Sequence, residues 1–84
     1  MTTQIIFNEA LSRYEMELEG YTVFANVRQK DGTLYIDYVE APPELRGKGA
    51  ASVLMEGLVA IAKAENLEIF PICGYAASWL RRHS

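Results

Sequence analysis

The spacing of apolar residues changes once along this chain, from every second residue to every third or fourth residue. Over residues 13–18 and 21–29 apolar and polar residues alternate, which is typical of strands with one face in water, and residues 33–41 are rich in β-branched and aromatic residues. From residue 51 onward the apolar positions form one stripe of a helix, made of Leu54, Met55, Leu58, Ile61 and Ala62. This change of period predicts an α+β fold in which the strands come first.

Short turns divide the alternating half into strands. We expect strands near residues 5–7, 13–18, 21–29 and 33–41. The pair Asp31 and Gly32 favours a tight hairpin because both residue types tolerate positive φ, and Glu19 with Gly20 marks another reversal. The first half is therefore predicted to be an antiparallel meander.

The second half is predicted to continue as helix, strand and helix. The first helix should end near Glu65 and Asn66, because Asn suits a left-handed C-cap. A short strand over residues 67–72 and a helix over 75–82 should follow, with Trp79 and Leu80 packed inward. Strand, helix and strand form a crossover, and crossovers join parallel strands. Residues 1–84 are thus expected to form one domain, with helices packed on one mixed sheet.

Charge and composition argue against several classes of protein. Eight basic and eleven acidic residues among 84 give a net charge of −3, so we expect no nucleic-acid partner. No apolar run reaches the ~18 residues that span a bilayer, and the first four residues do not resemble a secretory signal. The single cysteine, Cys73, cannot form an internal disulfide. We expect a cytoplasmic protein that is not bound to a membrane and holds no metal.

The loop between the third long strand and the first helix carries the clearest functional signal. Pro42 and Pro43 end the strand, because proline cannot donate to a β-ladder. Gly47 and Gly49 would let the backbone approach a ligand closely. The first amides of the helix that follows have no partner within the helix and suit a pyrophosphate. The alternative is a plain loop in which glycine only permits the turn.

Two common phosphate-binding motifs do not fit this loop. The P-loop requires the spacing G-x-x-x-x-G-K-[ST], which Gly47, Lys48 and Gly49 do not supply. The dinucleotide motif G-x-G-x-x-G would need glycine at position 52, where the chain has Ser52.

The same loop matches the acetyltransferase signature [Q/R]-x-x-G-x-[G/A] with the residues RGKGAA at 46–51. The stretch from Val39 to His83 resembles the small predicted acetyltransferases of the GCN5-related (GNAT) superfamily, whose core reads E-V-P-P-E-L-R-G-x-G, then P-x-C, then R-R-H. The corresponding residues are EAPPELRGKG at 40–49, PIC at 71–73 and RRH at 81–83.

This resemblance implies a minimal GNAT fold that binds acetyl-coenzyme A. It implies that backbone amides of one segment hold the pyrophosphate: Arg46, Gly47, Lys48, Gly49, Ala50 and Ala51. It also implies that the pantetheine arm pairs with the backbone near Val39 and Ala41, like an added strand. The acetyl acceptor would be an amine, on a small molecule or a protein, that the sequence does not identify.

Three residues are candidates for catalysis. Cys73 precedes the last helix, whose N-terminus would favour a thiolate nucleophile, although a lone cysteine can also be a small buried hydrophobe. Tyr38 stands where many members of the family have histidine, and tyrosine is a poor base. The base would then be Glu40 or the acceptor amine itself, and Glu40 could instead hydrogen-bond the loop amides.

Other functions and residues stay open at this point. A non-catalytic module that binds acyl-coenzyme A or another protein is the alternative to an N-acetyltransferase. His83 is expected to be frayed and solvated near the chain end, and Tyr75 and Trp79 are expected to be core contacts.

Overall fold

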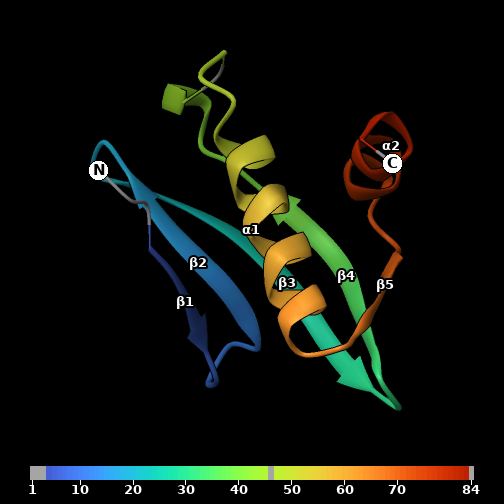
Figure 1. Cartoon of the computed structure of the whole chain (residues 1–84). Helices are drawn as coiled ribbons and strands as arrows, with labels where there is room; N and C mark the ends of the chain where they lie inside the picture. The colour runs from blue at the N-terminus through green and yellow to red at the C-terminus, as the bar shows by residue number, and fades with distance from the viewer. Residues whose placement is uncertain (1–3, 46, 84) are drawn as a thin grey trace.

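The computed structural model describes residues 4–45 and 47–83 and shows one five-stranded sheet with two helices (Figure 1). The strands are neighbours in chain order, β1-β2-β3-β4-β5. The elements are β1 (Ile5–Asn8), β2 (Arg13–Leu18), β3 (Tyr21–Lys30), β4 (Thr33–Glu40), the 3-10 turn η1 (Pro43–Leu45), α1 (Ala50–Ala64), β5 (Glu68–Pro71) and α2 (Gly74–Arg82). Neither helix, within this described part, is long and apolar enough to cross a membrane.

The first four strands form the predicted antiparallel meander. Glu19 and Gly20 have φ values of 53° and 84°, and Asp31 and Gly32 have 52° and 78°. Two consecutive positive φ values are what a type I′ turn requires, and this turn matches the twist of the strands that it joins. The expected α+β class, with one mixed sheet, is confirmed.

The crossover through α1 places β5 parallel to β4, as the period change predicted. Asn66 takes the left-handed conformation with φ of 56°, and the amide of Leu67 donates to the carbonyl of Ala62 at 2.8 Å. This bond closes the end of α1 and directs the chain into β5.

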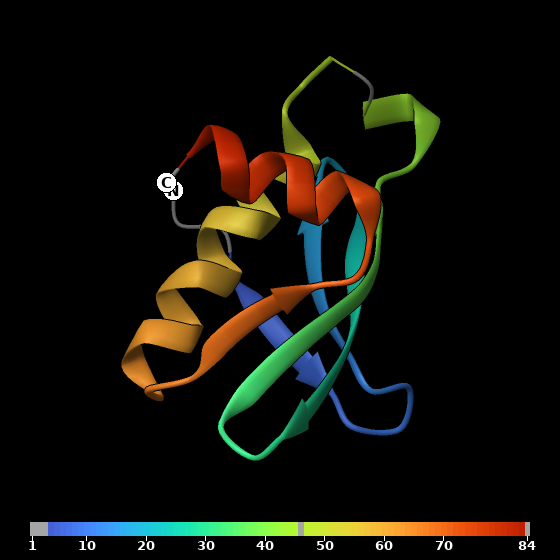
Figure 2. The ribbon, with the colours of Figure 1, turned by 90° about the vertical axis from the view of Figure 1, so that its right-hand side faces the viewer.

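Both helices lie on the same side of the sheet, and α2 crosses near the start of α1 (Figure 2). The indole nitrogen of Trp79 donates to the hydroxyl of Ser52 at 2.7 Å and joins the two helices. Beneath them the inward positions of the strands and the stripe of α1 form one core: Met16, Val23, Ala25, Val27, Leu34, Ile36, Val39, Leu45, Ala50, Leu54, Met55, Leu58, Ala76 and Trp79. The opposite face of the sheet is not covered by either helix.

One expectation about α2 was wrong, and another was right only in part. The ring of His83 stacks on Trp79 with 3.9 Å between centroids, and its Nδ1 lies 2.8 Å from the carbonyl oxygen of Trp79. His83 is therefore exposed but held, because the indole one helical turn earlier offers a flat surface. Tyr75 is 37% exposed and is not a core residue, whereas Trp79 is buried as expected.

Candidate functional site

The loop from β4 to α1 is built on one buried anchor and two glycines. Leu45 is 2% exposed, and its amide donates to the carbonyl of Pro42 at 3.0 Å, which forms η1. Gly47 and Gly49 have φ values of 81° and 69°, in the left-handed region where other residues are strained. The chain thus needs glycine at both positions to turn from η1 into α1. Arg46, assigned to the pyrophosphate by the resemblance, lies outside the described residues.

The start of α1 has the properties of an anion site. Gly49 is the N-cap, no described side chain caps the helix, and the first turn contains no acidic residue. The amide of Val53 makes the first helical bond, to the carbonyl of Gly49 at 3.0 Å. The three amides before it, at residues 50–52, fall in the turn where helix amides lack intrahelical partners and carry the positive end of the dipole. Such amides bind phosphate groups in many proteins.

The ammonium group of Lys48 forms an ion pair with Glu19. Its Nζ lies 3.1 Å from Oε1 of Glu19, in the turn between β2 and β3. Both side chains are about half exposed, so the pair is screened by water. The backbone of the loop, more than the charge of Lys48, is therefore the element suited to an anion.

The pairing of β4 with β5 is short, and the two strands then diverge (Figure 1). The ladder runs from Thr33 with Glu68 to Ile36 with Pro71. The carbonyl of Ile36 accepts the amides of Ile72 at 2.9 Å and Cys73 at 3.1 Å, after which the chain turns into α2. On the β5 side, residues 37–40 of β4 have no strand partner within the described chain. An extended ligand can pair with such an edge.

A β-bulge in β4 lies at the same place. Asn26 is opposite Tyr38 and Val27 is opposite Ile36, so Asp37 is an extra residue on β4. Bulges bend a strand and re-aim the side chains beside it. This bulge was not predicted from the sequence, although the inward positions Ile36 and Val39 are three residues apart instead of two.

Two of the three catalytic candidates, Tyr38 and Glu40, are in contact where β4 and β5 diverge. The hydroxyl of Tyr38 donates to Oε1 of Glu40 at 2.8 Å, and both residues are exposed. This hydrogen bond and the charge of Glu40 raise the pKa of Tyr38, with a smaller contribution from Cys73. Cys73 is the N-cap of α2 and is half-buried against the core. Tyr38 and Glu40 therefore form a hydrogen-bonded pair, and Cys73 is tied to the same strand through the bond from its amide to the carbonyl of Ile36.

The environment of Tyr38 decides what its hydroxyl can do. A raised pKa keeps the phenol protonated at neutral pH, so Tyr38 can donate a proton but cannot serve as a base. Glu40 accepts from Tyr38, and the described contacts give it no bond to the amides of the loop. A carboxylate with its second oxygen open to solvent is suited to attract an ammonium group.

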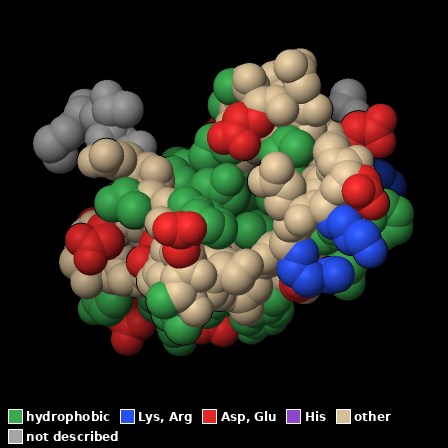
Figure 3. Space-filling model, turned by 90° about the horizontal axis from the view of Figure 1, so that it is seen from below, with side chains coloured by type: hydrophobic (Ala, Val, Ile, Leu, Met, Phe, Trp, Pro, Cys, Tyr) green, Lys and Arg blue, Asp and Glu red, His purple; other side chains and the backbone are tan. Residues whose placement is uncertain are grey.

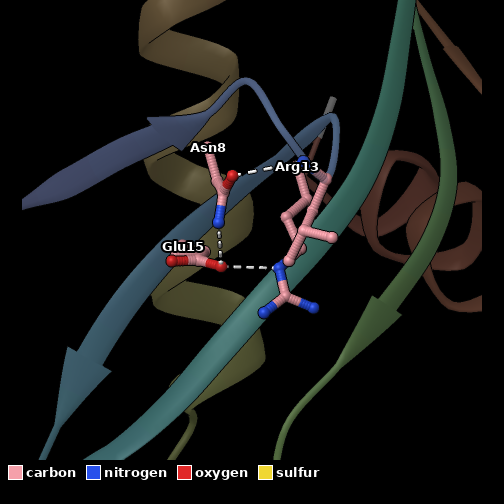
Figure 4. Close-up of polar contacts among 4 residues, drawn as sticks. Asn8, Arg13 and Glu15 are labelled. Atoms are coloured by element: carbon pink, nitrogen blue, oxygen red, sulfur yellow. Dashed lines mark hydrogen bonds and ion pairs between the residues drawn. The ribbon is translucent and has the colours of Figure 1, made fainter.

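Asn8, Arg13 and Glu15 form a polar cluster at the β1–β2 end of the sheet (Figure 4). Oε2 of Glu15 accepts from Nε of Arg13 at 2.6 Å and from Nδ2 of Asn8 at 3.1 Å, and these bonds lower the pKa of Glu15. The guanidinium of Arg13 lies 4.2 Å from the ring centroid of Phe24, whose ring is 6.4 Å from that of Tyr38. Phe24 was not predicted as a neighbour of Tyr38, because the contact depends on the register between β3 and β4.

No group of three or more described His, Cys, Asp or Glu residues could hold a metal ion. In comparisons with known proteins, a family model described as GCN5-related N-acetyl-transferase matches residues 13–84. No curated protein matches the chain.

Proposed function

The chain belongs to the GCN5-related N-acetyltransferase family, and from that premise we propose that it binds acetyl-coenzyme A and transfers the acetyl group to an amine. The observation that carries this proposal is the divergence of β5 from β4 after Ile36, beside a helix start that no described side chain caps. The free edge of β4 suits the extended pantetheine arm of the coenzyme, and the helix start suits its pyrophosphate.

In this arrangement the pyrophosphate accepts hydrogen bonds from the amides at the start of α1, and Gly47 and Gly49 turn the backbone toward it. The pantetheine arm runs along the free edge of β4 and pairs with the backbone near Val39 and Ala41. Val39 is buried on the helix side, so its side chain leaves that edge clear. The thioester then ends near Tyr38 and Cys73.

Direct transfer needs two proton movements. The amine nitrogen attacks the acetyl carbon, the carbon–sulfur bond breaks, and the coenzyme leaves as a thiolate. Tyr38 is held protonated and can give its proton to that sulfur, and Glu40 can accept the proton that the attacking nitrogen loses. The proton then returns from Glu40 to Tyr38 along their hydrogen bond.

Cys73 offers a second route to the same product. Its thiolate would attack the acetyl carbon and release coenzyme A, and the amine would then attack the resulting cysteine thioester. The two routes differ in one observable, because only the second forms an acetylated protein in the absence of acceptor. Mass spectrometry of the protein mixed with acetyl-coenzyme A alone separates them.

A non-catalytic acyl-coenzyme A-binding module is the second candidate. Tyr38, where many relatives have histidine, cannot act as a base, and this observation favours binding without turnover. Titration calorimetry with acetyl-coenzyme A, followed by release of free thiol when amines are added, tests both candidates. Binding should also raise stability by about 2.7 kcal/mol at about 100 times Kd. No heat of binding and no change in melting temperature would refute both.

A further inference from the structure

A second site for a ligand lies at the opposite end of α1 from the loop described above. A cleft of about 290 Å³ opens between the β1–β2 loop and the C-terminal end of the helix, and Figure 3 shows it as an apolar hollow. Its lining is Phe7, Ser12, Tyr14, Val27, Gln29, Leu34 and Glu65. The 15 residues of α1, at about 1.5 Å each, separate it by roughly 22 Å from the helix start.

The floor and one wall of the cleft are apolar. Val27 and Leu34 are 3% and 1% exposed and belong to the core. The rings of Phe7 and Tyr14 lie against each other with 4.9 Å between centroids and an angle of 55°. Phe7 is 44% exposed, so part of this aromatic wall is open to a ligand.

The wall is held in place by the backbone. The hydroxyl of Ser12 donates to the carbonyl of Val27 at 2.8 Å, and the amide of Val27 donates to the carbonyl of Ser12 at 3.0 Å. These two bonds fix the β1–β2 loop to β3. The cleft is therefore formed before any ligand binds, which reduces the entropy lost on binding.

One residue of the lining, Glu65, carries a carboxylate. Glu65 follows Leu58 by seven residues, so it continues the stripe of α1 that faces the sheet. Glu65 and Tyr14 both line the cleft, where burial raises the pKa of Tyr14 and the charge of Glu65 raises it further. Lys63, the basic residue of the last turn, is roughly 200° around the helix from Glu65 and does not line the cleft.

A carboxylate at this end of a helix is unfavourable by itself, because Glu65 caps the C-terminus, where the dipole is negative. A cation bound in the cleft would lie among the carboxylate, the helix end and two aromatic residues of the lining. Aromatic faces attract cations within ~6 Å of the ring centroid.

We propose that this cleft binds a small quaternary ammonium ion, such as the trimethylammonium group of choline, between Glu65 and the rings of Phe7 and Tyr14. Val27 and Leu34 offer no side-chain acceptors, so a primary ammonium placed over them would lose hydrogen bonds to water that only polar groups elsewhere in the lining, such as Gln29 and Glu65, could replace. A quaternary ammonium has no N–H groups to satisfy, so its methyl groups can contact this floor. The volume suits a ligand smaller than a drug molecule, since pockets for drug-sized ligands measure about 300–1,000 Å³.

The test is a titration of the full chain in the absence of acetyl-coenzyme A. Binding is monitored through the backbone amide resonances in nuclear magnetic resonance spectra. The probes are choline and its neutral analogue, in which a tert-butyl group replaces the trimethylammonium group. We expect saturable shifts at Ser12, Val27 and Glu65 with choline, and binding of the neutral analogue at least about fivefold weaker.

Two variants locate the interaction. Glu65→Gln should weaken choline binding about fivefold and remove the preference over the neutral analogue. Glu56→Gln is the matched control, because Glu56 is an exposed carboxylate of α1 that does not line the cleft, and it should bind choline normally. Tyr14→Leu should also weaken binding while leaving Glu65 in place. Equal binding of the two probes, or unchanged binding by Glu65→Gln, would overturn the proposal.

Discussion

The hydroxyl of Tyr38 is hydrogen-bonded to Oε1 of Glu40 at 2.8 Å, on the stretch of β4 that β5 no longer covers. Residues two apart on a strand face the same side, and the bulge at Asp37 sets which side that is. The bond therefore joins a proton donor and a proton acceptor next to the free edge of the strand.

This bond predicts how Tyr38 titrates. The pKa of Tyr38 is raised above the ordinary value of 10.0, mainly by its hydrogen bond to Glu40, so the phenol should ionise only above pH 10. Because the folded pKa is raised, the stabilising contribution of the bond is complete below pH 10 and is lost as the pH rises through the folded pKa. Tyrosinate absorbance of the protein and of Tyr38→Phe, taken as a difference, gives the titration of this one group.

Glu40→Gln provides the control for that titration. It removes the negative charge, so the pKa of Tyr38 should fall toward 10.0 while the other tyrosines titrate as before. An unchanged pKa in Glu40→Gln would show that the bond does not control the phenol.

The second prediction concerns the loop. Gly49→Val should weaken binding of acetyl-coenzyme A much more than Lys48→Ala. Gly49 has a φ of 69°, and a β-branched residue held there carries strain of about 1–3 kcal/mol, which the chain relieves by moving the backbone that meets the ligand. Lys48 forms an exposed pair with Glu19, so removing its side chain leaves the backbone unchanged. Calorimetric Kd values would settle this, with circular dichroism to show that both variants fold. Equal losses would mean that the backbone is not the binding element.

A third prediction tests the contact between the helices. Ser52→Ala should destabilise the protein by about 1–3 kcal/mol, because the indole N–H of Trp79 would lose its acceptor while the side chain stays buried. For a domain of this size, each 1 kcal/mol lowers Tm by about 4–8 °C. Ser78→Ala is the control, since Ser78 accepts only an exposed bond from Arg82, and its Tm should change little. A Tm unchanged by Ser52→Ala would show that water replaces the lost acceptor.

Local signals predicted most of the fold, and long-range packing accounts for what they missed. Asp31 and Gly32 were enough for the hairpin, and the helical stripe was enough for α1, because both depend on neighbours in sequence. The cleft could not be predicted, because its lining comes from separate elements whose distances depend on how α1 sits on the sheet. His83 was misjudged for a related reason, because its position near the chain end was weighed without the stacking surface of Trp79.

Some features of the candidate site were predicted from the sequence and others were not. The glycines of the loop were recognised because turning a chain sharply into a helix requires left-handed residues, which Gly47 and Gly49 supply. The bond between Tyr38 and Glu40 fits their spacing of two on one strand, whereas a shared site with Cys73 stays a prediction. The bulge at Asp37 was not foreseen, because a single break in alternation also occurs where a strand ends.

The last prediction concerns Cys73, which is half-buried at the start of α2 and close enough to Tyr38 to influence its pKa. If the pantetheine arm follows the edge of β4, its sulfur ends near this thiol. Iodoacetamide should then alkylate the folded protein at neutral pH, with the thiolate displacing iodide, and bound coenzyme A should slow that reaction. Cys73→Ala should retain coenzyme binding, since the loop at the start of α1 is unchanged.

The two roles of Cys73 give different results in this experiment. A nucleophile would be acetylated when the protein meets acetyl-coenzyme A alone, and Cys73→Ala would then lose transfer. If Tyr38 and Glu40 suffice for direct transfer, Cys73→Ala would keep transfer and no acetylated protein would form. A thiol that reacts only in denaturant is a packing residue, and its loss should cost stability by leaving a small cavity. Alkylation rates in native buffer, with and without coenzyme A and compared with the rate in denaturant, therefore determine whether Cys73 faces the ligand.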